Sequence, residues 1–299
     1  MALSIHTNYS SLITQTNLSK TNNALGTNQQ RLGTGFRINS AADDAAGLQI
    51  ATRLNAQSRG MDVAIRNTSD SISLLQTAEG ALTEMTDIVQ RMKDLATQAA
   101  NATASEKDRD ALQAEYDQLG QELGNIVKNT KYAGEGLFSD GTTTDGTGGK
   151  FGAAMNFQIG ASAAETLTLD VSTSLGDLAT ALDGLSAQFA TPDSTTPGTE
   201  IAGADTTAAN GMIDTLSDAL DSIGSLRAQF GANINRLNHT ANNLSNMKDN
   251  TDMAKGRIMD ADFAKESANM SKNSMLLQSG ISMLKQAGQM PGMVMSLLG

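Results

Sequence analysis

The stretch "LLQTAEGALTEMTDIVQRMKDLATQAA", from Leu74 to Ala100, decides the fold class of this chain. Steps of three and four residues from Leu75 always reach an apolar side chain, and most residues between these stops are polar. This spacing is typical of one face of an α-helix. The stops are Leu75, Ala78, Leu82, Met85, Val89, Met92, Ala96 and Ala99. We therefore expect a long helix whose narrow apolar stripe packs against other helices.

The helical pattern around this stretch runs from about residue 41 to about residue 100. Ser40 lies three residues before Asp43, which predicts a helix N-cap there. Sixty helical residues would span about 90 Å, whereas a compact chain of this length has a radius of gyration of about 19 Å. We therefore expect an elongated, mainly α protein: a bundle or coiled coil of long antiparallel helices.

Further patterns supply the partners of this helix. Ser105 with Asp108 predicts a capped helix, and a second long helix begins near residue 208. Between them, two runs with alternating apolar residues predict a small β-hairpin, followed by one short helix over 175–189. The predicted stripes are Leu112, Tyr116, Leu119, Leu123 and Ile126 in the first helix, and Leu216, Ala219, Ile223, Leu226, Phe230, Leu237, Leu244 and Met247 in the second.

The two ends of the chain each carry a single apolar seam with a seven-residue spacing, which is a helix-packing period. The seam residues are Leu18, Leu25, Leu32, Phe263, Met270, Leu277 and Leu284. Gly33 and Gly35 are expected to end the first helix, and Pro291 with Gly292 to interrupt the last one. Two seams alone bury little surface. We therefore expect both arms to be loose in the monomer and to order against neighbouring copies.

Charge and composition limit the partners. The formal net charge is -11, which argues against nucleic acid. Residues 1–42 and 267–299 contain no acidic residue, and such sparse charge suits a surface buried by assembly. The chain has no Cys, so disulfides and Cys-ligated metals are excluded. Neither a cleavable signal peptide nor a stretch long enough for membrane insertion is apparent.

These observations divide the chain into five segments. We expect an N-terminal arm, the first part of a helical shaft, a short hairpin and surface segment, the second part of the shaft, and a C-terminal arm. Their expected bounds are 1–42, 43–140, 141–207, 208–256 and 257–299.

Four stretches closely resemble bacterial flagellins. They are "QQRLGTGFRINSAADDAAGLQIATRLNAQSRG" (29–60), "SISLLQTAEGALTEM" (71–85), "FQIGASAAETLTLDV" (157–171) and "ANMSKNSMLLQSGISMLKQAGQMPGMVMSLLG" (268–299). The resemblance implies a secreted, extracellular subunit that polymerises into the flagellar filament used for swimming. Its implied partners are further copies of itself, an export chaperone and the export apparatus, a filament cap and hook–filament junction proteins.

The resemblance also implies a ligand of the Toll-like innate-immune receptor for flagellin. The matching residues are Gln90, Arg91 and Leu95 on one helix and Glu115 on the next. The alternative is that Arg91 and Glu115 form an ordinary solvated ion pair, which contributes at most about 1 kcal/mol.

Catalytic patterns are missing from the sequence. Only His6 and His239 are present, and no His-Glu-x-x-His motif occurs. "DGTGGKFG" lacks the spacing of a phosphate loop, and Asp140 with Asp145 lack the ligand pattern of a calcium loop. We therefore expect neither enzymatic activity nor a cofactor. Two alternatives to a filament subunit remain, a hook–filament junction protein and a secreted enzyme displayed on a helical stalk.

Overall fold

The computed structural model describes residues 8–192, 196–203 and 206–298. Within these residues the chain forms two compact units. The terminal unit contains the residues up to Ser58 and those from Asp249 onward, and the central unit contains Arg59–Lys248. The predicted arms, 1–42 and 257–299, both fall within the terminal unit.

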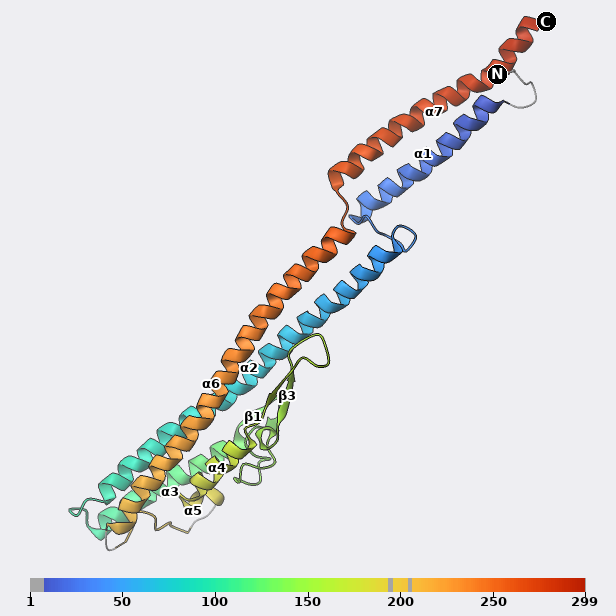
Figure 1. Ribbon diagram of the computed structural model, residues 1–299. Helices are drawn as coiled ribbons and strands as arrows, with labels where there is room; N and C mark the ends of the chain where they lie inside the picture. Colours follow the sequence, from blue (N-terminus) through green and yellow to red (C-terminus); the bar gives the residue numbers. More distant parts are fainter. Residues whose placement is uncertain (1–7, 193–195, 204–205, 299) are drawn as a thin grey trace. The chain divides into compact units, whose positions relative to one another are not determined.

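Long helices dominate both units, which confirms the mainly α prediction (Figure 1). Their bounds are α1 (Tyr9–Thr34), α2 (Ala45–Ala99), α3 (Glu106–Asn129), α6 (Thr207–Met259) and α7 (Phe263–Leu298). In the terminal unit α1 and α7 lie side by side and antiparallel. Asn8, before α1, contacts Ala287 late in α7, and Arg31 near the end of α1 contacts Glu266 early in α7.

The end of α1 agrees with the predicted glycine break. Gly35 adopts a left-handed backbone with φ 74°, and its N–H donates to the carbonyl of Arg31 at 2.9 Å. This conformation closes the last turn of the helix, and it favours glycine because a Cβ would be strained there.

The predicted N-cap at Ser40 is wrong. Helix α2 begins at Ala45, and the carboxylate of Asp44 accepts the N–H of Gly47 at 2.8 Å, so Asp44 caps the helix. The carboxylate of Asp43 instead accepts the N–H groups of Asn39 and Ser40, at 3.0 and 2.8 Å. Ser40 and Asp43 therefore hold a turn that precedes the helix.

The predicted interruption at Pro291 is also wrong, because α7 continues to Leu298. Proline has no N–H, so the carbonyl four residues earlier, that of Ala287, loses its partner within the helix. The side-chain amide of Asn8 donates to this carbonyl at 2.6 Å. A contact from α1 thus supplies the hydrogen bond that the sequence of α7 cannot.

The apolar stripe of α2, from Leu75 to Ala99, forms the core of the central unit. Each of its eight side chains is at most 1% exposed. The stripe packs in one cluster with Tyr116 and Leu123 of α3 and with α6 residues from Leu216 to Leu237, as the sequence predicts. Helices α2 and α6 are antiparallel, because Asp62 pairs with Lys248 and Lys93 donates to Ser217.

The start of α3 is the predicted capping box. The hydroxyl of Ser105 accepts the N–H of Asp108, and the carboxylate of Asp108 accepts the N–H of Ser105 at 2.9 Å. These bonds to the charged form lower the pKa of Asp108, the Ser105 hydroxyl and backbone being the main causes.

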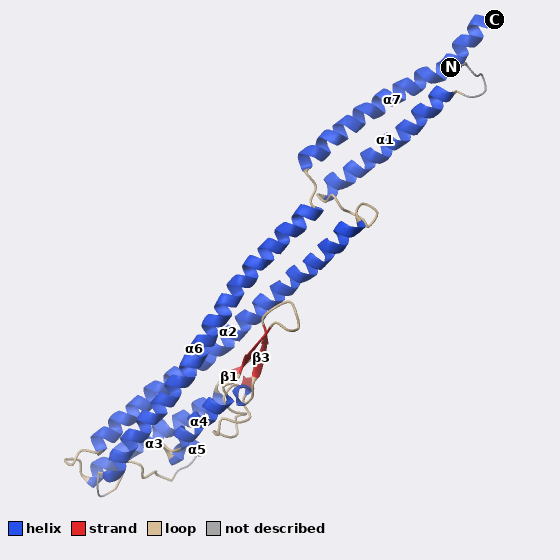
Figure 2. Cartoon of the chain, viewed as in Figure 1, coloured by secondary structure: helices blue, strands red, loops and turns tan. Residues whose placement is uncertain are grey.

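Among the described residues, strands occur only as short pairs in the central unit (Figure 2). The predicted hairpin is β3 (Met155–Gln158) with β4 (Thr166–Leu169), and its Phe157, Leu167 and Leu169 enter the core. A second pair, β1 (Lys131–Tyr132) with β2 (Glu135–Gly136), was not predicted. The short helix predicted over 175–189 is two helices, α4 (Ser172–Asp183) and α5 (Ala187–Ala190), because Ser186 caps a new start.

The turn of this hairpin lies against α2 at Gly60. A Cβ placed on Gly60 would lie 2.8 Å from the Cβ of Ala161, which is closer than real Cβ contacts. Asn67, two turns further along α2, donates to the carbonyl of Gln158. Gly60 is therefore a docking position for the hairpin, whereas a Cβ on Gly80 would meet nothing within 4 Å.

This difference predicts opposite outcomes for two glycine substitutions in one helix. Gly80→Ala should raise the free energy of unfolding by about 0.5–1 kcal/mol, because alanine favours the helix. Gly60→Ala gains the same propensity but must displace the hairpin, so we expect it to be at least about 1 kcal/mol less stable than Gly80→Ala. Urea unfolding followed by circular dichroism measures both, and equal gains would contradict the docking role.

Candidate self-assembly surface

The predicted seam residues line the contact between α1 and α7 with one exception. Six are partly buried in the single chain, and Phe263 remains 66% exposed. The six are Leu18, Leu25, Leu32, Met270, Leu277 and Leu284. None reaches the burial of the central stripe, because each helix has only the other to cover it.

A second set of large apolar side chains on these two helices is exposed. On α1 these are Tyr9 (63% exposed), Leu12 (58%) and Ile13 (45%), and on α7 they are Met275 (65%), Leu276 (48%), Ile281 (49%) and Met283 (60%). We call these seven residues the terminal apolar surface. So large a group of exposed apolar residues on paired helices is typical of an interaction surface.

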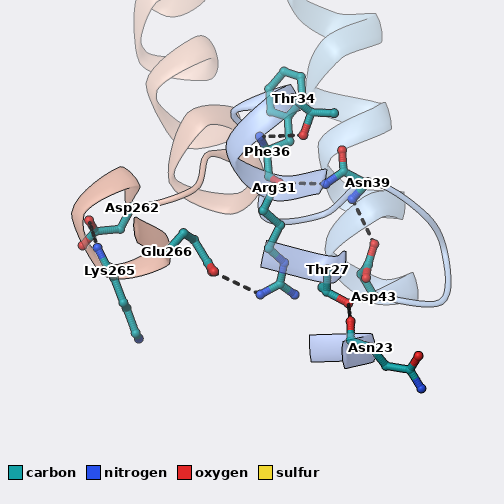
Figure 3. Close-up of polar contacts among 10 residues, drawn as sticks. All are labelled: Asn23, Thr27, Arg31, Thr34, Phe36, Asn39, Asp43, Asp262, Lys265 and Glu266. Atoms are coloured by element: carbon teal, nitrogen blue, oxygen red, sulfur yellow. Dashed lines mark hydrogen bonds and ion pairs between the residues drawn. The ribbon is translucent and has the colours of Figure 1, made fainter. Parts of the chain in front are cut away.

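Polar contacts flank the seam at the junction of α1 with α7 (Figure 3). Arg31 donates to Glu266 at 3.2 Å, and Glu266 is only 7% exposed. One turn earlier, the side-chain amide of Asn28 is only 7% exposed and lies next to the carbonyl of Ala24 and the N–H of Met270. The heptad pattern did not reveal these polar positions, because a period reports apolar residues alone.

Backbone hydrogen bonds tie the chain after α1 to the chain before α7. The N–H of Arg37 donates to Met259 at 2.6 Å, and the N–H of Ala261 donates to Gly35 at 2.9 Å. The guanidinium of Arg37 adds a bond to the carbonyl of Ile258. Both ends of the chain are thus joined in one unit by contacts that no local sequence signal predicts.

The residues of this chain that are expected to bind the Toll-like receptor include exposed residues and one buried residue. Arg91 on α2 pairs with Glu115 on α3 at 2.6 Å, with side chains 53% and 47% exposed, and Gln90 is also exposed. Leu95 is 1% exposed and belongs to the core. The structure therefore brings Arg91 and Glu115 together on the surface and places Leu95 beneath it.

The two aspartates in the Gly-rich loop accept hydrogen bonds from threonines of the same loop. Asp140 accepts the N–H and hydroxyl of Thr142, and Asp145 accepts those of Thr147. The threonine hydroxyls are the main causes that lower the pKa of both carboxyls. In the part of the chain that the structure describes, no group of three or more His, Cys, Asp or Glu residues is arranged for a metal ion.

The two histidines form no site in the described residues. His239 lies exposed on α6, and His6 lies outside the residues that the structure describes. None of the described helices combines the length and the hydropathy that crossing a membrane requires.

A mainly α chain with a complete helical core and a terminal apolar surface has the features of a structural subunit. Comparison with known proteins identifies its family. The family models for the bacterial flagellin N-terminal and C-terminal helical regions match residues 5–143 and 213–298. Flagellin A of Vibrio anguillarum is 36% identical, and polar flagellin C of Vibrio parahaemolyticus is 34% identical, each over the whole of both chains. The chain belongs to the bacterial flagellins.

Membership in this family answers the broad functional question. The protein is a structural subunit of the extracellular flagellar filament and not an enzyme. The alignment with flagellin A spans 388 positions, so that relative carries sequence which this chain of 299 residues lacks. A solved structure of a flagellar hook-associated protein from Vibrio parahaemolyticus shares the fold, with a TM-score of 0.57 and 15% identity over 73% of this chain and all of that one.

The turn between α1 and α2 makes a testable electrostatic prediction. The backbone of Ser40 is the main cause that lowers the pKa of the Asp43 carboxyl, followed by the backbone of Asn39 and the hydroxyl of Ser40. Because the folded pKa is lowered, this contribution to stability is complete above the ordinary pKa of aspartate and is lost as the pH falls through the folded value.

We expect Ser40→Ala to raise the pKa of Asp43 toward its ordinary value, because the hydroxyl bond at 3.1 Å disappears. Carboxyl carbon NMR over a pH titration measures this shift. Thr52→Ala, which removes a hydroxyl bonded within α2, serves as the control and should leave Asp43 unchanged. An identical Asp43 titration in all three proteins would contradict the role of Ser40.

Proposed function

We propose that this flagellin builds the filament by coupled folding and packing of its terminal helices. The observation that carries the proposal is the terminal apolar surface, seven large apolar side chains between 45% and 65% exposed. In the assembled filament, α1 and α7 of neighbouring copies cover these residues. The partner is a further copy of this chain, because every subunit presents the same incomplete surface.

Energetic magnitudes support assembly as the step that orders the arms. Ordering the backbone costs about 1–2 kcal/mol per residue. Full burial of a large apolar side chain returns about 1.5–3 kcal/mol. Across the residues of α1 and α7, this ordering cost exceeds what a partly covered seam returns, so the pair needs the added burial that neighbouring copies provide.

The central unit has a different task in this proposal. Its stripe is fully covered by α3 and α6 within one chain, so it folds before assembly and supplies lateral contacts. Packed seams between such rigid units settle in discrete registers. Two registers would let one filament hold two subunit conformations and supercoil.

The proposal also includes export of the subunit and its folding at the filament tip under a cap protein. The chain leaves the cell unfolded through the flagellar export apparatus, and an export chaperone covers the C-terminal arm beforehand. Met275, Leu276 and Met283 supply exposed apolar surface for that chaperone. A cap protein then guides folding at the filament tip, and junction proteins join the filament to the hook. Family resemblance is the support for these partners.

The proposal predicts the behaviour of a truncated chain. Deletion of residues 1–40 and 265–299 should leave a soluble helical monomer that does not polymerise, because the central core is intact and the terminal apolar surface is gone. Circular dichroism and sedimentation check the fold, and electron microscopy after seeding with filament fragments checks assembly. The full chain is the control. Normal filaments from the truncated chain would refute the role of the arms.

Recognition by the Toll-like receptor for flagellin is a second proposed function. Gln90, Arg91 and Glu115 form the exposed recognition group, and Leu95 supports the helix from the core. The favouring observation is that Arg91 donates to Glu115 from two nitrogens, at 2.9 and 2.6 Å, which holds the guanidinium in one orientation. Arginine so fixed is a frequent anchor in protein interfaces.

Arg91→Ala should reduce receptor activation by monomers about fivefold or more, because an anchoring arginine typically contributes over about 1 kcal/mol. The fold should survive, because an exposed ion pair contributes at most about 1 kcal/mol to stability. Arg66→Ala, another exposed arginine on α2, is the matched control. A dose–response assay in receptor-expressing cells measures potency. Equal potency of Arg91→Ala and Arg66→Ala would contradict the proposal.

A further inference from the structure

The apolar seam between α1 and α7 does not determine how the two helices align. Leu18, Leu25 and Leu32 repeat every seven residues, and so do Met270, Leu277 and Leu284. Sliding α7 along α1 by one repeat, about 10.5 Å, would again set large apolar residues against large apolar residues. A feature outside the seam must therefore select one alignment.

Pro291 creates such a feature. Because proline lacks an N–H, the carbonyl of Ala287 is left without its helical partner, and Ala287 is 8% exposed, so water has little access to this position. A buried carbonyl without a partner costs about 1–3 kcal/mol. This carbonyl therefore marks one position along α7 that has to meet a donor.

The side-chain amide of Asn8 supplies this donor and also caps α1. Its nitrogen donates to the carbonyl of Ala287 at 2.6 Å, and its oxygen accepts the N–H of Ser11 at 3.0 Å as the N-cap of α1. The amide has a fixed donor end and a fixed acceptor end, so this orientation alone satisfies both partners. A slip of one repeat would part Asn8 from Ala287 in either direction.

A second polar contact between α1 and α7 lies at the other end of the helix pair. Arg31 donates to the buried Glu266 at 3.2 Å. A slip would leave the carboxylate of Glu266 without the guanidinium, and an unpaired buried charge is strongly unfavourable. Polar contacts at both ends thus favour the same alignment.

We infer that Pro291 and Asn8 together set the register of the terminal helix pair. The proline leaves one carbonyl on α7 without its helical donor, and Asn8 donates to that carbonyl at one alignment only. The fixed register gives every subunit the same terminal apolar surface, which identical neighbours must recognise. The inference rests on the proposed self-assembly, and it assigns to Pro291 a positive role in place of a helix stop.

A double-mutant cycle tests the inference in the full chain. Asn8→Ser keeps an N-cap of similar quality but is too short to reach α7. Pro291→Ala restores an N–H for the carbonyl of Ala287. In the natural background, Asn8→Ser should raise the critical concentration for seeded filament growth about two- to tenfold, the effect of one buried hydrogen bond. In the Pro291→Ala background, the same substitution should change it less than about twofold.

Other results would overturn the inference. These are equal losses in both backgrounds or no loss in either. Growth of the unmodified chain on seeds is the reference, and its absence would instead refute the proposed assembly.

Register itself can be read by cross-linking, because the natural chain has no cysteine. A Cβ on Gly280 would lie 3.0 Å from a methyl group of Leu18, so Leu18→Cys with Gly280→Cys reports the observed alignment. Leu25→Cys with Gly280→Cys and Ser11→Cys with Gly280→Cys report slips of one repeat. Adding Asn8→Ser should increase cross-linking of a slipped pair at the expense of the observed one. Unchanged proportions would count against the inference.

Discussion

A narrow apolar stripe has to be covered along its whole length, and this requirement organises the central unit. The stripe from Leu75 to Ala99 would expose a row of apolar side chains if α2 stood alone. Helices α3 and α6 cover it so completely that no member is more than 1% exposed. The hairpin and the short helices add to the same core, and their positions follow from a surface that the three long helices have already formed.

The terminal unit obeys the same requirement but meets it only in part. Two helices can shield one seam from each other, but they leave their outer faces in water. The seam is partly buried while Met275 and Leu12 are more than half exposed. The central unit covers its stripe within one chain, whereas the terminal unit leaves apolar faces exposed. In the assembly that we propose, identical neighbours cover those faces, so folding of the first unit is separate from assembly through the second.

Periodic features of the sequence were predictable, and features that depend on distant partners were not. The long stripes and the capping box at Ser105 are local patterns, and both are confirmed except at Met247, the last residue of the predicted α6 stripe, which is 39% exposed. Gly60 contacts the hairpin turn, and nothing nearby in the sequence reveals this contact. The continuation of α7 through Pro291 depends on Asn8, and no reading of the helix alone supplies that donor. Ser40 and Asp44 are both residue types that cap helices, so only the geometry shows that Asp44 is the cap of α2.

The contact between Asn8 and Ala287 joins residues 279 positions apart, and this separation has a consequence for newly made protein. On a ribosome adding about 5–20 residues per second, α1 emerges roughly 15 to 60 s before its partner exists. During that interval the first helix has nothing in its own chain to pair with. The order of synthesis thus keeps the two halves of the assembly surface apart until translation is almost finished.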